Sequence, residues 1–414
     1  MSRWGVATVL ALAAALAVGQ DAPRPPAPAL EAASRPPREA EVEALPEGDP
    51  RRPGQFLDLA LTRHEEAEEL EAQERQAHDE ALARWRAARD GPRPAFATPR
   101  ADARRAEAVR LAGRALDEGA GFERAPEALL VAGLDAERIG RSRDALHLLG
   151  ALVRRHPESR FVPDAWLALG ERHLHEGDLT RARAAFEVVT RRGTPAAAAW
   201  SWARLAEVAL LAPDAEGALG ALERALADGS TQALAILDRL GAAHERLGWD
   251  RAPLLRLAEL CQLSGDATAS EALRARAARA APGAAAGAAR GGVARPHPGV
   301  ALPGGPRTLL VGGEPFAWRV VGERGAEAAA ARLAAYAENT GAAALAAGDA
   351  ATAEALLARA VAAEPAGWRA RLLRALALGK LGRDAEALAE AERVLDLERG
   401  QADALQLVVG LRQR

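Results

Sequence analysis

The residues best suited to chemistry are few in this sequence and lie far apart. The chain has eight histidines and one cysteine, Cys261, and only His173 and His175 are closely spaced. Side chains two residues apart on a helix point about 200° apart, so this pair cannot hold one metal ion. Cys261 lies in an apolar stretch without an accompanying histidine or asparagine motif, and we expect it to be a buried, unreactive thiol.

The sequence also lacks the short motifs that build common catalytic centres. No G-x-x-x-x-G-K-[ST] phosphate loop, G-x-S-x-G nucleophile elbow or H-E-x-x-H zinc motif occurs. A single cysteine excludes an internal disulfide and every multi-cysteine zinc site. We therefore predict no enzyme activity, no catalytic residue, no metal site and no cofactor.

The composition indicates a nearly neutral chain that is large enough for two or three domains. It has 414 residues, with 54 basic and 57 acidic side chains and a formal net charge of −3. This balance gives no global basic field that would attract nucleic acid. Nucleic acid is therefore not an expected partner.

The N-terminal segment is typical of a signal peptide. Arg3 precedes an apolar run at 5–18, which is shorter than the about 20 residues of a membrane-spanning helix. Small residues at Ala17 and Gly19 predict cleavage before Gln20, so that residues 1–19 are removed from a periplasmic or secreted protein. The alternative is an uncleaved segment that anchors the chain in the inner membrane through residues 5–18.

Two segments of different composition follow. Residues 20–54 are rich in proline and contain no aromatic residue, which predicts a disordered spacer. Residues 55–89 contain no glycine or proline and favour one long helix. A second helix is expected from about Ala101 to Glu118, which gives an N-terminal helical region at 55–120. The long helix has few apolar positions, so it lies against the following helices or joins two copies of the chain into a homo-oligomer.

The middle of the chain repeats a unit of about 34–37 residues. The clearest copy, at 163–195, reads Trp166-x-x-Leu169-Gly170-x-x-His173, then Ala182-x-x-x-Phe186, and ends with Pro195. Small residues such as Gly170 let two helices approach closely, and large ones such as Phe186 fill the space beside them. Alanines equivalent to Ala182 mark the other copies at Ala145, Ala218, Ala353 and Ala387.

This pattern resembles the tetratricopeptide repeat over about 126–230 and 334–414. The resemblance implies an all-α fold, an α-solenoid of helical hairpins in two blocks with a Gly/Pro-rich linker between them. The segment 159–192 is particularly similar to repeats of bacterial envelope proteins that act as scaffolds. The predicted regions are a repeat array at 121–281, the linker at 282–325, and a C-terminal repeat pair with a capping helix at 326–414.

Between the two blocks the repeat pattern weakens. Three helices are expected at about 232–247, 251–263 and 267–280. Within the linker, apolar runs at 308–311 and 316–321 flank Gly-Gly-Glu-Pro and predict either a small β-hairpin or an extended strap packed on the helices.

The family resemblance also implies where a partner would bind. In these repeats the first helix of each hairpin lines a concave groove, and the corresponding positions here combine apolar and acidic side chains. Such a groove suits a peptide with apolar anchors and basic residues. The polar and aromatic candidates for this partner-binding groove are Glu137, Arg138, Asp164, Glu171, His175, Trp200 and Glu207.

We therefore expect a non-catalytic scaffold in the bacterial cell envelope that binds a protein or peptide partner. Two alternatives remain at this point. The chain could be a structural module that self-associates through residues 55–89, or an enzyme whose site lies near 231–325.

Overall fold

The computed structural model describes residues 39–88, 91–119, 121–280, 310–311, 314–315, 319–321 and 328–413. Over these residues the fold is an all-α solenoid of helical hairpins, as the repeat pattern predicts, with one pair of two-residue strands. The chain divides into two compact units, 1–197 and 198–414. The boundary falls inside the array predicted at 121–281.

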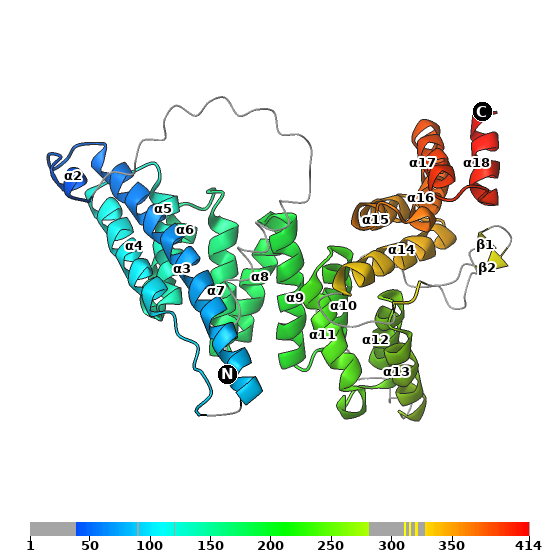
Figure 1. Ribbon diagram of the computed structural model, residues 1–414, viewed down its shortest axis with the longest axis horizontal. Coiled ribbons are helices and arrows are strands. Elements are labelled where there is room, and N and C mark those ends of the chain that lie inside the picture. Colours follow the sequence, from blue (N-terminus) through cyan, green and yellow to red (C-terminus); the bar gives the residue numbers. More distant parts are fainter. Residues whose placement is uncertain are drawn as a thin grey trace. The chain divides into compact units, whose positions relative to one another are not determined.

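The first unit is a series of helices in which each packs against the next (Figure 1). α4 packs on both α3 and α5, α5 on α6, and α7 on both α6 and α8. The helices are α2 (Glu39–Glu43), α3 (Arg52–Ala88), α4 (Pro99–Glu118), α5 (Ala125–Arg138), α6 (Ser142–Arg155), α7 (Val162–Glu176) and α8 (Leu179–Arg192), and α9 (Pro195–Leu211) begins at the unit's end.

The second unit continues with shorter helices and ends with two regular hairpins and a single helix. Its elements after α9 are α10 (Ala215–Ala227), α11 (Thr231–Ala242), a 3₁₀ turn at His244–Arg246, α12 (Arg251–Leu263), α13 (Ala267–Arg279), β1 (Leu310–Val311), β2 (Glu314–Pro315), α14 (Ala329–Ala347), α15 (Ala350–Ala363), α16 (Trp368–Lys380), α17 (Asp384–Leu397) and α18 (Ala402–Arg412). α18 lies on α16 and α17, at the predicted position of the capping helix.

Three hairpins, α5–α6, α7–α8 and α14–α15, close on one small residue that faces one large residue. A Cβ atom on Gly170 of α7 would lie 2.8 Å from Cε1 of Phe186 on α8. The same contact recurs between Gly133 and Leu149 and between Gly341 and Leu357, where an added Cβ would lie 2.7 Å from the leucine. This spacing is too short for any larger residue, so the glycines fix how closely the two helices of each hairpin approach.

The turn inside a hairpin is encoded by a glycine and a following cap. Gly177 has φ of 80°, and the next residue, Asp178, accepts a hydrogen bond from the backbone N–H of Arg181. Gly348 has φ of 89°, and Asp349 accepts from the N–H of Thr352 in the same way. The left-handed glycine ends the first helix and the aspartate begins the second, which explains why Gly-Asp marks these turns in the sequence.

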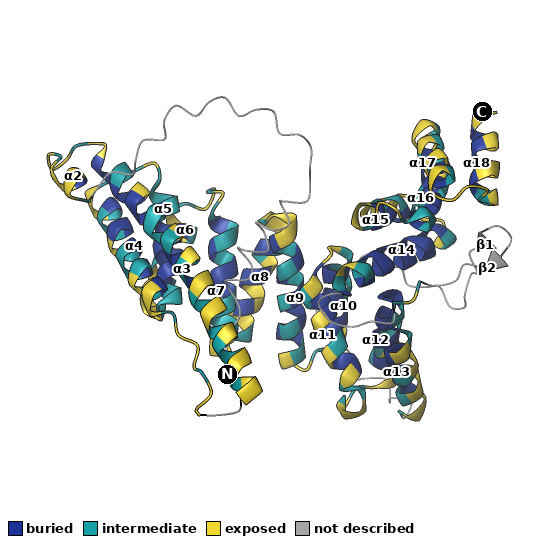
Figure 2. Ribbon diagram, in the orientation of Figure 1, coloured by how far each residue is buried: buried dark blue, intermediate teal, exposed yellow. Residues whose placement is uncertain are grey.

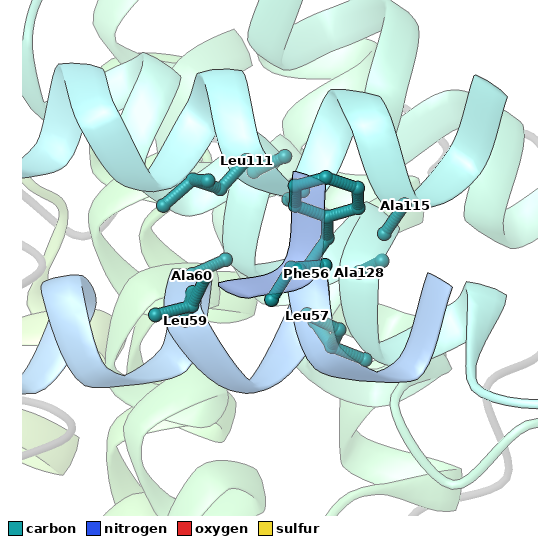
Figure 3. Packing of buried hydrophobic residues seen from close by; sticks show 10 residues of the cluster. Phe56, Leu57, Leu59, Ala60, Leu111, Ala115 and Ala128 are labelled. Carbon is teal, nitrogen blue, oxygen red and sulfur yellow. The ribbon is translucent and has the colours of Figure 1, made fainter. Parts of the chain in front are cut away.

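The N-terminal region differs from the predicted spacer at 20–54. Its described part, from Glu39 onwards, is folded: Val42 of α2 is fully buried in a core with Phe56, and α3 begins at Arg52 rather than Gln55. Figure 3 shows Phe56 and Ala60 of α3 facing α4 in this core. Ion pairs from Arg110 and Arg114 of α4 to Glu39 and Glu43 of α2 hold the short segment in place, which its proline content did not reveal.

α3 is held on α4 and α5 by buried charges as well as by this core. Arg105 of α4 is 1% exposed and forms ion pairs with Glu68 and Glu71 of α3. Nδ1 of His64 on α3 lies 2.9 Å from Oδ1 of Asp135 on α5, a carboxylate that is fully buried. The apolar side of α3 thus packs within its own chain.

In the second unit, α14 is seated on helices from before the linker. It contacts α10, α11 and α12, and almost its whole length is buried (Figure 2). Arg332 of α14 is 1% exposed and donates two hydrogen bonds of 2.7 and 2.9 Å to Asp238 on α11. Asn339 donates to the carbonyl of Leu263, and Tyr336 donates to that of Glu223. The C-terminal helices therefore form one compact unit with α10–α13.

The linker prediction is corrected in detail. β1 and β2 pair antiparallel, Leu310 with Pro315, so the second strand includes 314–315, before the run predicted at 316–321, of which 316–318 lie outside the described residues. Residues 319–321 instead form an extended strap: the N–H of Val321 donates to the carbonyl of Gly265, and the N–H of Arg319 donates to Oδ1 of Asn339. Both options left open by the sequence thus occur, on different residues.

Of the three helices predicted just before the linker, one ends earlier than expected and two agree with the prediction. The helix predicted at 232–247 ends at Ala242, whereas α12 and α13 match their predicted ranges to within one residue. Cys261 of α12 is buried, as expected. No helix in the described part of the chain combines the length and apolar character needed to span a membrane.

Candidate partner-binding surface

Three predicted groove residues of the first unit lie along one face of α7. Asp164, Glu171 and His175 are separated by seven and four residues, spacings that place side chains above one another on a helix. Asp164 and Glu171 are partly exposed, and His175 is exposed. We call these three residues the α7 strip. Its opposite side carries Leu169 and Gly170, which are buried in the hairpin and fix the direction in which the strip faces.

The carboxyl group of Asp164 is the least compensated charge of this strip. Burial raises the pKa of the Asp164 carboxyl above its ordinary value, and no arginine or lysine of the described residues lowers it. A half-buried carboxylate without a cation is unfavourable, so a basic group that approached Asp164 would gain an ion pair in a partly dehydrated place.

The other two candidates of the first unit are already engaged within the chain. Nη1 of Arg138 lies 3.2 Å from Oε2 of Glu71 on α3, and Nη1 of Arg172 on α7 donates to Glu137 at 3.3 Å. Burial alone would raise the pKa of Glu71, but Arg138 and Arg105 lower it further than that. Glu137 and Arg138 therefore connect neighbouring helices, and their assignment to the groove stays a prediction.

The two candidates of the second unit, Trp200 and Glu207, belong to one connected row on α9. The guanidinium of Arg204 lies 4.8 Å from the centre of the Trp200 ring, and Arg204 also pairs with Glu207. Glu207 accepts a further hydrogen bond of 2.9 Å from Arg239 on α11. Trp200 is partly exposed, and the Arg204 guanidinium that lies over its ring is neutralised by Glu207.

Sequence reasoning missed the residues that engage the candidates. Glu71, Arg172 and Arg239 come from other helices, and no local pattern connects them with Arg138, Glu137 or Glu207. Arg204 could have been found, because it lies three residues before Glu207 and four after Trp200 on the same helix.

The described residues contain no group of three histidine, cysteine or carboxylate side chains placed to hold a metal ion. His173, the neighbour of His175 in sequence, lies at the inner side of α7 and 3.8 Å from Glu176. The chemistry that this surface offers is therefore recognition by charge, hydrogen bonding and stacking.

Comparison with protein families finds the tetratricopeptide repeat in two stretches, at 130–198 and 339–404. The two stretches match the model of this repeat and together span about a third of the chain. The first matched stretch holds the α5–α6 and α7–α8 hairpins and so includes the α7 strip. The second holds most of α14 and all of α15–α17, whose small-to-large contact repeats that of the first.

Several solved structures have low similarity to this chain. A tetratricopeptide repeat protein from Parabacteroides merdae is 10% identical, with 82% of this chain and 100% of that chain covered and a TM-score of 0.28. The TPR2AB domain of yeast Sti1, in complex with pHSP90, is 14% identical, with 82% and 99% covered and a TM-score of 0.21. For yeast Tom70 the identity is 12%, the coverage 76% and 59%, and the TM-score 0.21.

No curated protein matches the chain at a significant level. The assignment of the repeats therefore rests on the two matched stretches and on the hairpin geometry described above.

Proposed function

We propose that this protein is a non-catalytic interaction scaffold of the bacterial cell envelope that binds a peptide or an exposed segment of a partner protein. The α7 strip contacts a basic residue of that segment, and apolar residues beside the strip hold its anchors. The observation that carries the proposal is the half-buried, uncompensated carboxyl group of Asp164 within a tetratricopeptide repeat.

The chemistry of the strip favours a basic partner segment. Asp164 and Glu171 place two carboxylates on one face of α7, and Leu174 lies beside them with part of its side chain exposed. A charge-assisted hydrogen bond to a partly buried carboxylate contributes about 1.5–3 kcal/mol. One arginine or lysine of the partner would thus supply a large share of the specificity.

The envelope location rests on the N-terminal sequence, which lies outside the described residues. A short apolar run with small residues before Gln20 supports export. N-terminal sequencing of the protein recovered from its native host tests this part of the proposal. A chain that begins at Gln20 supports a periplasmic or secreted scaffold, and one that retains residues 5–18 supports a membrane anchor.

Peptide binding is tested by selecting from a displayed random peptide library on the purified chain. We expect the enriched peptides to carry arginine or lysine next to apolar residues. Binding of one such peptide, followed by fluorescence anisotropy, should weaken at least about tenfold with Asp164→Asn and with Glu171→Gln.

Asp144→Asn is the matched control, because Asp144 is an exposed carboxylate in the first turn of α6 and lies outside the strip. Its effect on peptide affinity should stay within about twofold. Peptides without basic residues, or equal losses in Asp144→Asn and Asp164→Asn, would overturn the proposed binding surface.

A further inference from the structure

The outward sides of α6 and α8 carry many exposed arginines. Arg143, Arg154 and Arg155 lie on α6, and Arg181, Arg191 and Arg192 on α8, all of them exposed. We call these six residues the outer basic face. The exposed carboxylates of α6, α8 and the loop between α6 and α7 are only Asp144, Glu158 and Glu187. The face is thus locally basic in a chain whose formal net charge is −3.

Most of these arginines have no carboxylate partner among the described residues. No carboxylate of the described residues lies within ion-pair distance of Arg143, Arg154, Arg155 or Arg191. The carboxylates nearest to Arg181 and Arg192 are distant, at 3.5 Å for Asp178 and 3.8 Å for Glu158, and Arg192 also donates a hydrogen bond of 2.8 Å to the carbonyl of Pro157.

Several arginines elsewhere in the same unit are paired within the chain. Arg104, Arg114 and Arg124, which are partly exposed, each have a carboxylate partner at 3.0 Å or less. On α6 and α8, by contrast, four exposed arginines gather without such a partner among the described residues. Their charge remains available for a ligand outside the chain.

The arrangement of the charges indicates a broad anionic surface rather than a single anion. Arg143, His147 and Arg154 follow one line along α6, at spacings of four and seven residues, while Leu149 and Leu152 on the other side are buried in the hairpin. Arg191 adds a guanidinium on α8, the second helix of the next hairpin. None of the exposed large apolar side chains of the described residues lies on α6 or α8, so the face would not insert into hydrocarbon or stack on bases.

We propose that the outer basic face docks this protein on anionic lipid headgroups at a membrane surface. Guanidinium groups bind phosphate oxygens through paired hydrogen bonds, and a cluster of unmatched arginines is attracted to the negative potential of such a bilayer. A lipid surface is favoured over nucleic acid because the face has no aromatic platform and because the apolar run at 5–18 indicates a route to or across a membrane. The α7 strip, on a first helix of the same unit, would stay available for its own partner.

Vesicle sedimentation of the full chain tests the proposal. Vesicles of phosphatidylcholine are compared with vesicles that also contain phosphatidylglycerol, because the apolar run at 5–18 would bind both kinds and only the basic face would distinguish them. Each arginine near an anionic surface contributes roughly a fivefold factor to binding. We expect the preference for anionic vesicles to fall at least about tenfold when Arg143, Arg154, Arg155 and Arg191 are all changed to glutamine, and to fall with added salt.

The matched control removes the same charge from the second unit. Arg239, Arg279, Arg383 and Arg412 are exposed arginines that pair with Glu207, Glu245, Glu386 and Glu392, and their change to glutamine should leave the vesicle preference within about threefold. Circular dichroism confirms that both variants keep their helices. Equal losses in the two variants, equal binding to both kinds of vesicle, or binding to duplex DNA but not to anionic vesicles would overturn the proposal.

Discussion

The α7–α8 hairpin and the seat of α14, where this helix packs on α10–α12, differ in the contacts that join their helices. In the hairpin, Gly170 meets the ring of Phe186, and the contact is entirely apolar. In the seat, α14 brings Arg332 and Asn339 against α10–α12, and the contact depends on hydrogen bonds between buried polar groups. Both joints position helices closely, but only the first recurs at fixed spacing along the chain.

This difference shows which contacts between helices a repeat pattern in the sequence can predict. A small-to-large contact between helices about 16 residues apart is encoded locally, so it can be copied from hairpin to hairpin. The seat of α14 joins residues on either side of a long insertion, and each polar contact needs one particular partner, because an unpaired group would be left buried. Such a joint is specific to one place and leaves no periodic trace in the sequence.

The largest effect is expected from removing the charged side chain at the seat of α14. Arg332→Ala should lower the free energy of unfolding by about 3–5 kcal/mol, because it leaves Asp238 and the Ser264 carbonyl without their buried donor. Chemical denaturation followed by circular dichroism measures the loss.

Arg359→Ala is the control, since Arg359 is exposed and pairs with Asp228 at 3.6 Å. Its cost should not exceed about 1 kcal/mol. If the two variants lose equal stability, the seat does not depend on its buried ion pair, and the contrast with the hairpin joint disappears.

The hairpin joint is tested by overfilling it. Gly170→Leu should lower the free energy of unfolding by about 1–3 kcal/mol, because the new side chain would occupy the space of the Phe186 ring. Gly113→Leu on α4 is the matched control: an added Cβ there meets nothing within 4 Å, and losing a helical glycine should be neutral or stabilising. Thermal melting compares them, and a melting temperature for Gly170→Leu as high as for Gly113→Leu would contradict the repeat register.

A smaller, pH-dependent effect is expected where α3 meets α5. Burial alone would lower the pKa of His64, but the hydrogen bond and negative charge of Asp135 raise it above the ordinary value. The protonated form is therefore favoured by folding, and the contribution is complete below the unfolded-state pKa and is lost as the pH rises through the folded-state pKa. Unfolding measured across this pH range should show parent and His64→Gln chains converging as the pH rises, and a constant difference would contradict the prediction.

The smallest change in stability is expected on α9. Trp200→Ala removes a partly exposed ring that contacts Arg204, so the melting temperature should fall by no more than a few degrees and the helix content should stay constant. A large loss of helicity would place Trp200 among the packing residues that join hairpins. If the melting temperature of Trp200→Ala stays within that range, the affinity of this variant for the selected peptide shows whether Trp200 takes part in binding.

The repeats could be predicted from the sequence because their determinants are local. Gly170, Phe186, Gly177 and Asp178 lie within one hairpin, and each acts through a contact or turn that spacing alone specifies. The folded segment from Glu39 was missed because its few apolar residues, such as Val42 and Leu45, lie among prolines and charges, and the burial of Val42 depends on α3 and α4.

The candidate site was predicted only in part for the same reason. The repeat positions implied by the family resemblance selected Asp164, Glu171 and His175, which lie on one face of α7. The engagement of Arg138 by Glu71 and of Glu137 by Arg172 depends on which side chains of neighbouring helices reach across, which no spacing within one helix encodes. The unmatched arginines of α6 and α8 also become apparent only when the carboxylates near them are known.

The seat of α14 has a practical consequence for how this chain can be divided. Because side chains of α14 and the strap at 319–321 hold the C-terminal helices on α10–α13, the covalent link through 281–309 is not what keeps them together. Fragments 1–281 and 310–414, produced as separate polypeptides, should reassociate into the same second unit. That junction is a natural split site, where a reporter domain can be inserted or an association-dependent assay built without altering a repeat.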